Sequence, residues 1–205
     1  MSEINVRRIG RNEARVPIIG TAPVIVHRFD EKARETMLAG FQGRKTPKSP
    51  KDPEAEFNRA RWRVDDHRDG FPASGFKAAL VGGARYFQDK KLSMTLLKQA
   101  IFVNGVGLDM LVPFEAGPPK MREDYVRLSQ STTSLVYRPM YEPWAAELSI
   151  LYVPSLMNLE SVVALVDAGG LGGIGEWRPS SRNSSTGVYG TFTVDDSREV
   201  KELRG

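Results

Sequence analysis

The chain has 205 residues, 40% of them hydrophobic, with no cysteine and a formal net charge of +4. This composition supports one folded domain over residues 1–205 and excludes a disulfide framework, cysteine-based zinc sites and disorder of the whole chain. No apolar run approaches the ~18 residues that a membrane helix needs, and the first residues lack the apolar core of a signal peptide, so we predict a cytoplasmic protein without a membrane partner.

The first forty residues predict a basic lead-in, two short strands and a helix. Residues 16–29 are β-rich, but two prolines and a glycine interrupt them, so we expect two short pieces. Asp30 is suited to cap a helix that ends at Gly40. The lead-in fits an arm along a nucleic-acid backbone and a solvated terminus equally well. It contains Arg7, Arg8, Arg11 and Arg15.

Residues 40–70 have the composition of a basic flexible insertion within the domain. Residues 43–53 are basic and proline-rich and have no apolar periodicity, which is typical of a segment outside a core. A short helix is predicted over residues 54–63. The charged turn that follows holds His67 among aspartates, a set that could ligate a metal, but turns of this composition are usually only solvated. We therefore predict no metal site.

Residues 71–87 predict a buried helix that carries a pair of glycines. Apolar residues recur at helical spacing, and Ser74 is placed to cap the helix start. Gly82 and Gly83 weaken a helix by about 1 kcal/mol each relative to alanine, so close packing against another backbone is a reasonable use for them. Lys77, in the first turn, either helps the free N–H groups to hold an anion or points to water.

The middle of the chain is rich in predicted strands. Residues 92–102 predict a helix, or a helix that runs into a strand, and the proline within residues 110–114 marks an edge strand. Residues 125–138 predict a hairpin with an arginine near each end. The clearest strand spans residues 144–154, where Ala146 and its alternate neighbours form one apolar face.

The C-terminal part predicts a helix capped by Asn158, a glycine-rich loop, a strand over residues 188–194 and a charged tail over residues 195–205. Five of the seven residues from 169 to 175 are glycine, and an indole and two arginines follow. Glycines let a backbone approach a ligand closely, while arginine and indole suit phosphates and bases. The alternative is a long surface loop with helix-stop glycines. The run follows a helix rather than a strand, which disfavours a dinucleotide site.

The gross order of these elements indicates the fold class. An early β-α unit and a late β-α-β unit surround a β-rich middle. This order predicts an α+β protein with an elaborated ferredoxin-like or RRM-like fold and a flexible thumb-like insertion.

Three motifs occur together in the chain. The β-rich start ends in Val-His-Arg, residues 71–80 read Phe-Pro-Ala-Ser-Gly-Phe-Lys-Ala-Ala-Leu, and the glycine-rich segment ends in Gly-Val-Tyr-Gly-Thr-Phe at residues 187–192. Together they resemble the RAMP superfamily, in particular the backbone subunits of CRISPR effector complexes. The resemblance covers most of the chain, and a free-standing relative encoded by a phage or mobile element fits it as well as a CRISPR subunit does. It implies a modified RRM fold that binds single-stranded nucleic acid along its backbone, often as a homo-oligomer or beside other effector-complex subunits. Residues 40–63 would then be a thumb that reaches a neighbouring subunit.

We predict a nucleic-acid-binding surface of cations, small residues and aromatic rings, without a cofactor. Residue types alone do not distinguish RNA from DNA as the partner. Trp62 and Phe41 are further stacking candidates, unless they fill the core or a subunit contact. The predicted surface comprises Arg7, Arg8, Arg44, Lys45, Lys48, Ser74, Lys77, Arg85, Arg127, Arg138, Gly172, Gly173, Gly175, Trp177, Arg178, Arg182 and Tyr189.

Two alternatives remain open at this stage. Some RAMP proteins cut RNA, and the resemblance places His27 and Asp30 at the matching positions, although Asp30 is also the predicted helix cap. The second alternative is a phage structural or assembly protein whose arm over residues 40–63 swaps between subunits. Our leading prediction is binding without catalysis.

Overall fold

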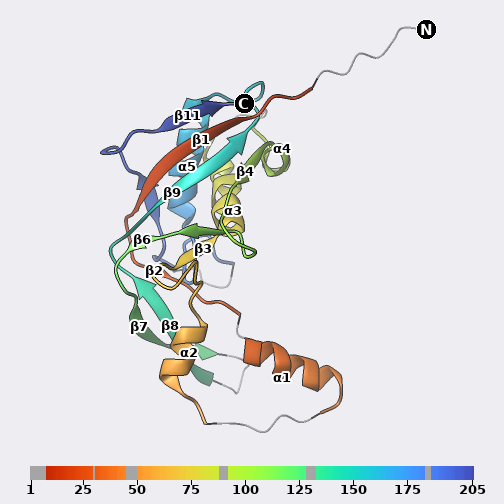
Figure 1. The fold of residues 1–205 in the computed structure, drawn as a ribbon, viewed down its shortest axis with the longest axis vertical. Coiled ribbons are helices and arrows are strands. Elements are labelled where there is room, and N and C mark those ends of the chain that lie inside the picture. The colour runs from red at the N-terminus through yellow and green to blue at the C-terminus, as the bar shows by residue number, and fades with distance from the viewer. Residues whose placement is uncertain (1–7, 30, 45–49, 88–91, 128–132, 183–185) are drawn as a thin grey trace, which may run out of the picture.

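The computed structural model describes residues 8–29, 31–44, 50–87, 92–127, 133–182 and 186–205 (Figure 1). A six-stranded antiparallel sheet forms the larger part of the molecule, with the strand order β10–β1–β9–β4. The extra strands β11 and β6 pair with β1 and β9, respectively. The six strands are β1 (Asn12–Gly20), β4 (Ile101–Val103), β6 (Glu115–Ala116), β9 (Trp144–Tyr152), β10 (Phe192–Val194) and β11 (Lys201–Arg204).

The order of elements along the chain confirms the predicted fold class. Two long helices, α3 (Ala73–Gly83) and α5 (Leu159–Gly172), lie side by side against the sheet (Figure 1). The chain runs β1, α3, β4, β9, α5, β10, which is the β-α-β-β-α-β arrangement of a ferredoxin-like domain. Each helix therefore connects strands that are separated by one other strand in the sheet.

The core lies between the sheet and the two helices. On β9, Ala146, Leu148 and Ile150 are fully buried, as the alternation predicts, and Leu148 stands opposite the buried Val16 of β1. The Asn158 side chain accepts a hydrogen bond from the Ser161 N–H and caps α5, which confirms that prediction as well. Burial of one face of each strand fixes the register of the sheet.

Glycines allow α3 and α5 to approach each other closely. A Cβ atom on Gly83 would lie 2.7 Å from the backbone nitrogen of Gly169, and one on Gly169 would lie 3.0 Å from the backbone of Ala79. Close backbone packing, predicted for both glycines of α3, is therefore correct for Gly83. It is wrong for Gly82, where a Cβ atom would meet nothing within 4 Å.

The two adjacent glycines should respond oppositely to alanine. Gly82→Ala should raise the free energy of unfolding by about 0.5–1 kcal/mol, because alanine favours helix and fits the open space. Gly83→Ala should lower it by about 1–3 kcal/mol, because the new methyl group forces α3 away from α5. Urea unfolding of both variants measures the difference, and an equal response would contradict the close approach of the helices.

A second, smaller part of the molecule extends beyond the main sheet (Figure 1). Its three-stranded sheet has the order β2–β8–β7 and contains the predicted hairpin. A separate two-stranded sheet pairs β3 with β5, and helix α1 projects from the body (Figure 1). The elements are β2 (Val24–Ile25), α1 (Glu31–Phe41), α2 (Pro53–Arg59), β3 (Gly70–Pro72), η1 (Ala84–Tyr86), α4 (Met94–Ala100), β5 (Leu111–Pro113), β7 (Lys120–Arg127) and β8 (Thr133–Tyr141).

Several local expectations need correction. Ser74 is not a cap: α3 starts at Ala73, so Ser74 lies inside its first turn, and no side chain caps the helix. Ala60, Asp69 and Gly70 are buried and Trp62 packs against the core, although composition places residues 40–70 in a flexible insertion. The charged tail forms β11, and the last core strand starts only at Phe192. Within the described part of the chain, no helix is long and apolar enough to cross a membrane.

Candidate functional site

A basic groove runs between α3 and the segment that follows α5. Its volume is about 520 Å³, and five cationic side chains line it. None of the described residues along its wall is acidic. The cations are Lys77, Arg85, Lys98, Arg178 and Arg182, and the other wall residues include Phe71, Ser74, Gly75, Met94, Gly173 and Gly175.

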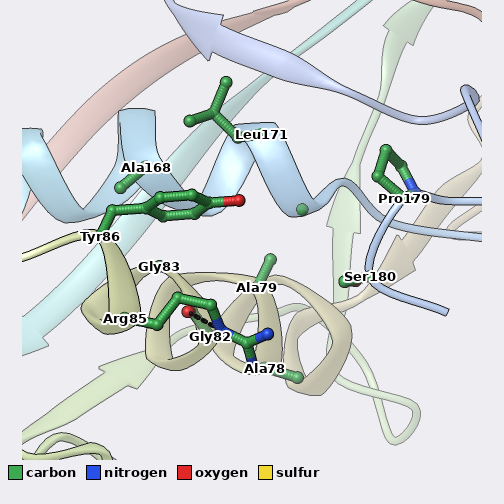
Figure 2. A pocket seen from close by; sticks show the side chains of 11 residues that line it. Ala78, Ala79, Gly82, Gly83, Arg85, Tyr86, Ala168, Leu171, Pro179 and Ser180 are labelled. Atoms are coloured by element: carbon green, nitrogen blue, oxygen red, sulfur yellow. Dashed lines mark hydrogen bonds between the residues drawn. The ribbon is translucent and has the colours of Figure 1, made fainter. Parts of the chain in front are cut away.

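A smaller hollow of about 130 Å³ continues this groove along the second half of α3 (Figure 2). The two spaces share Arg85 and Ser180 among their wall residues. Figure 2 shows Tyr86 beside the α5 residues Ala168 and Leu171, with Ser180 across from α3. The combined groove is therefore open along much of the length of α3, as an extended ligand would require.

The cations of the groove differ in how firmly the protein holds them. Arg178 donates from Nη1 to the Gly175 carbonyl at 2.7 Å, and Arg85 donates from Nε to the Gly82 carbonyl at 3.0 Å. Both bonds leave other guanidinium N–H groups of each side chain for a ligand. Arg182 is exposed at the rim.

Lys77 is held by the protein rather than pointing to water. Its Nζ donates to the Lys98 carbonyl at 2.7 Å and lies 4.1 Å from the centre of the Phe102 ring. Burial lowers the pKa of Lys77 from its usual value. These contacts place its charge beside the first turns of α3, on the wall of the groove.

The glycine-rich segment is shaped by backbone packing. Gly173, Gly175 and Gly190 have positive φ angles, and Cβ atoms on Gly175 and Gly190 would collide with the carbonyls of Ile25 and Ile174. The Ile174 N–H donates to the Gly190 carbonyl at 3.0 Å, and the Glu176 N–H donates to the Ile25 carbonyl at 2.8 Å. The Ile174 and Glu176 N–H groups are therefore used inside the protein, and the cations carry the binding potential of this segment.

A buried ionic cluster links the hairpin to the glycine-rich segment. Asp124 accepts hydrogen bonds from Arg122 Nε at 2.7 Å and Arg138 Nη1 at 3.3 Å, and it is 5% exposed. Arg122 also donates to the Tyr189 hydroxyl at 2.8 Å, and Arg138 Nη2 lies 3.9 Å from Glu176 Oε2. Arg138, which the sequence predicts as a phosphate ligand, is instead buried and paired.

The predicted aromatic stacking residues lie outside the groove walls. The Tyr189 ring packs under the Arg122 guanidinium at 4.8 Å, and the indole nitrogen of Trp177 is buried. Trp62 packs against the core and lies under Arg28, while Phe41 is 83% exposed on α1. The groove is therefore a surface for phosphates more than for bases.

The remaining predicted residues fall into three groups. Gly172 lies in the last turn of α5 and lines the smaller hollow. Arg8, Arg44, Arg127 and His27 are exposed and are not among the groove residues. Arg7, Asp30, Lys45 and Lys48 lie outside the described residues.

Lys98 and Met94 are among the groove residues that the sequence predictions missed. Lys98 and Met94 reach the groove because α4 runs beside α3, a contact between helices that no local pattern encodes. A basic residue in the last turn of a predicted helix was the available signal for Lys98.

No group of three or more potential metal ligands exists among the described residues. In the charged turn, Asp65 binds Arg68 instead, and this hydrogen bond together with the His67 N–H lowers the pKa of Asp65 to about 2. Asp69, from the same turn, is buried beside Arg61 and Tyr141. Asp65 and Asp69 are thus used in separate, protein-internal contacts.

The fold and the groove together define a ferredoxin-like α+β domain with a basic channel beside its two helices. No protein-family model matches the chain, and no curated protein matches it. Among solved structures, it is similar to a chain of "Type III-B Cmr-beta bound to cognate target RNA", with 11% identity and a TM-score of 0.42. That match covers 95% of this chain but 61% of the other. Cmr6 from Pyrococcus furiosus is similar at 10% identity and a TM-score of 0.42, with coverage of 92% and 100%.

The fold is assigned from the strand order of the chain itself.

Proposed function

We propose that this protein binds single-stranded nucleic acid along its phosphate backbone, in the groove between α3 and residues 173–182, without catalysis. The observation that carries the proposal is the set of five cations on walls that contain no described acidic residue. Such a surface attracts a polyanion and releases its counterions on binding.

The start of α3 adds to the electrostatic attraction. Ser74 and Gly75, in its first turn, line the groove, and no side chain caps this end of the helix. The first N–H groups of a helix carry partial positive charge and favour an anion. A phosphate held there would also lie near the Lys77 ammonium group, which the groove wall presents.

Binding should tolerate most sequences. Phosphate contacts position a strand but carry no sequence information, and the predicted stacking rings lie outside the groove. We expect RNA and DNA single strands to bind, with any difference arising from the 2′-hydroxyl.

Affinity should fall steeply with salt. If about four phosphates are neutralised, the logarithm of the association constant should fall with the logarithm of salt concentration at a slope of about −3. Fluorescence polarisation with a labelled oligonucleotide over a salt series measures this slope. Binding that does not respond to salt, or no binding at low salt, would contradict the proposal.

We further propose that the protein coats its strand as an oligomer. Helix α1 projects from the body and exposes Met37, Leu38 and Phe41, which supports an intermolecular contact. Light scattering should show assemblies that grow when oligonucleotide is added. Assembly of the same size with and without nucleic acid would favour a structural protein with a swapped arm.

Absence of catalysis is the last part of the proposal. Labelled RNA incubated with the protein should stay intact. Cleavage that His27→Ala abolishes would instead support the endonuclease alternative.

A further inference from the structure

An exposed tyrosine stands at the end of the smaller hollow, where α3 is followed by η1. Tyr86 is 55% exposed and lines this hollow of about 130 Å³. Figure 2 shows its side chain reaching across to Ala168 of α5, with the hydroxyl pointing into the hollow. Within the described chain, no aromatic ring or cation stacks on the ring, and no residue bonds to the hydroxyl. The ring is therefore an aromatic surface that these parts of the protein leave unused.

A second aromatic ring on the described walls is already occupied by the protein. Phe71 lines the basic groove, but its ring lies over the first turn of α3, because a Cβ atom on Gly75 would lie 2.3 Å from Phe71 Cε1. The ring centres of Phe71 and Phe76 are 6.0 Å apart, with an interplanar angle of 84°. Tyr86 is therefore the more accessible of the two rings for a ligand.

The hollow and the basic groove form one continuous space. They have five wall residues in common, which are Ala78, Ala79, Gly82, Arg85 and Ser180. The arginine of this set directly precedes the tyrosine in the chain, and adjacent Cα atoms are about 3.8 Å apart. A strand whose phosphate contacts this arginine therefore brings a base within reach of the tyrosine ring.

Gly82 keeps the passage between the groove and the hollow open. It lines both spaces, and a Cβ atom there would meet nothing within 4 Å, so the packing of α3 does not require a glycine. Glycine is less favourable than alanine inside a helix. A ligand that passes close to the helix backbone accounts for a glycine at a position where packing does not.

We propose that Tyr86 stacks on one base of the strand bound in the groove, and that Gly82 leaves the room through which this base enters the hollow. Many proteins that bind single strands combine a positively charged groove with aromatic rings on which bases stack. Such stacking accepts any sequence, because every base has a flat π-face. This inference rests on the proposed function, because the groove delivers the strand.

Oligothymidine and an abasic strand of tetrahydrofuran nucleotides, of equal length, separate base contacts from phosphate contacts. Both strands carry the same phosphates, and the wild-type protein should bind oligothymidine about fivefold or more tightly. Tyr86→Ala should weaken the binding of oligothymidine by about the same factor, while the affinity for the abasic strand and the salt slope stay unchanged. Tyr86→Phe should keep the wild-type affinity for both strands. Fluorescence polarisation measures all of these affinities.

Tyr125→Ala is the matched control, because Tyr125 is 70% exposed on β7 and lies outside both spaces. It should leave both affinities unchanged, and a loss equal to that of Tyr86→Ala would overturn the assignment to the hollow. A Tyr86→Ala variant that melts like the wild type and binds oligothymidine equally well would overturn the inference. A wild-type protein that binds neither strand would instead overturn the proposed function.

Gly82→Leu tests the passage independently of the tyrosine. Leucine favours helix and its Cβ atom meets open space, so the variant should melt no lower than the wild type. Its side chain should nevertheless obstruct the base and weaken the binding of oligothymidine about fivefold more than that of the abasic strand. Equal weakening of the two strands, or no weakening of either, would overturn the role assigned to Gly82.

Discussion

Replacing Arg178 and Arg182 together by alanine should weaken the binding of a single strand by about tenfold to a hundredfold. Both side chains line the groove, and their charges face walls without a described carboxylate. Each loss removes a charge-assisted contact to a phosphate and one released counterion, so the salt slope should become shallower by about 1.4. Fluorescence polarisation over a salt series gives both quantities from one titration.

A matched control removes the same charge elsewhere. Arg15 and Arg204 lie on β1 and β11, are 47% and 85% exposed and pair with the partly buried Glu13 and Glu202. Alanine at both should change the affinity much less, since such surface pairs contribute little. The Arg182→Ala variant should melt like the wild type, whereas Arg178→Ala loses its bond to the Gly175 carbonyl, worth about 1 kcal/mol. An equal loss of affinity in the control would show that net charge, not the groove, drives binding.

Asp124→Leu should lower the free energy of unfolding by about 3–5 kcal/mol. Asp124 lies between Arg122 and Arg138, and its removal leaves the buried Arg138 guanidinium with one ionic partner among the described residues, the Glu176 carboxylate at 3.9 Å. Arg122 is 31% exposed and can turn toward water, so the cost arises mainly at Arg138. Chemical unfolding followed by circular dichroism measures the loss.

The double variant Asp124→Leu with Arg138→Met separates a buried charge from a packing defect. Because the double variant contains no unpaired buried charge, it should be more stable than Asp124→Leu alone. Glu123→Ala, next to Asp124 but exposed, should change stability by less than about 0.5 kcal/mol. If the double variant is as unstable as the single one, the ionic cluster is not the cause.

Local patterns were sufficient where an element depends on residues close to it in sequence. The alternation from Ala146 to Tyr152 and the Asn158 cap describe interactions within one strand and one helical turn, and the structure has both. The order of such elements was enough for the ferredoxin-like class, because only a few topologies connect a given series of strands and helices.

The site itself needed contacts between distant segments. The predicted nucleic-acid-binding surface included residues of α3 and of the segment after α5, and the groove unites Ser74 and Lys77 with Arg178 and Arg182. The burial of Arg138 in an ion pair was not predictable from the sequence. Its partner Asp124 lies on the other strand of the hairpin, and the burial of Arg138 depends on the whole ionic cluster.

The sequence by itself determined the α+β class, the main strands and helices and the cations available for a polyanion. These depend on hydrophobic period and residue type, which are properties of short segments. Only the tertiary structure decided which cations share a groove and which are buried in ion pairs. It also decided that the positive-φ glycines at 173, 175 and 190 serve backbone packing, because the same residue type fits a ligand or a carbonyl and only the neighbour in space distinguishes them.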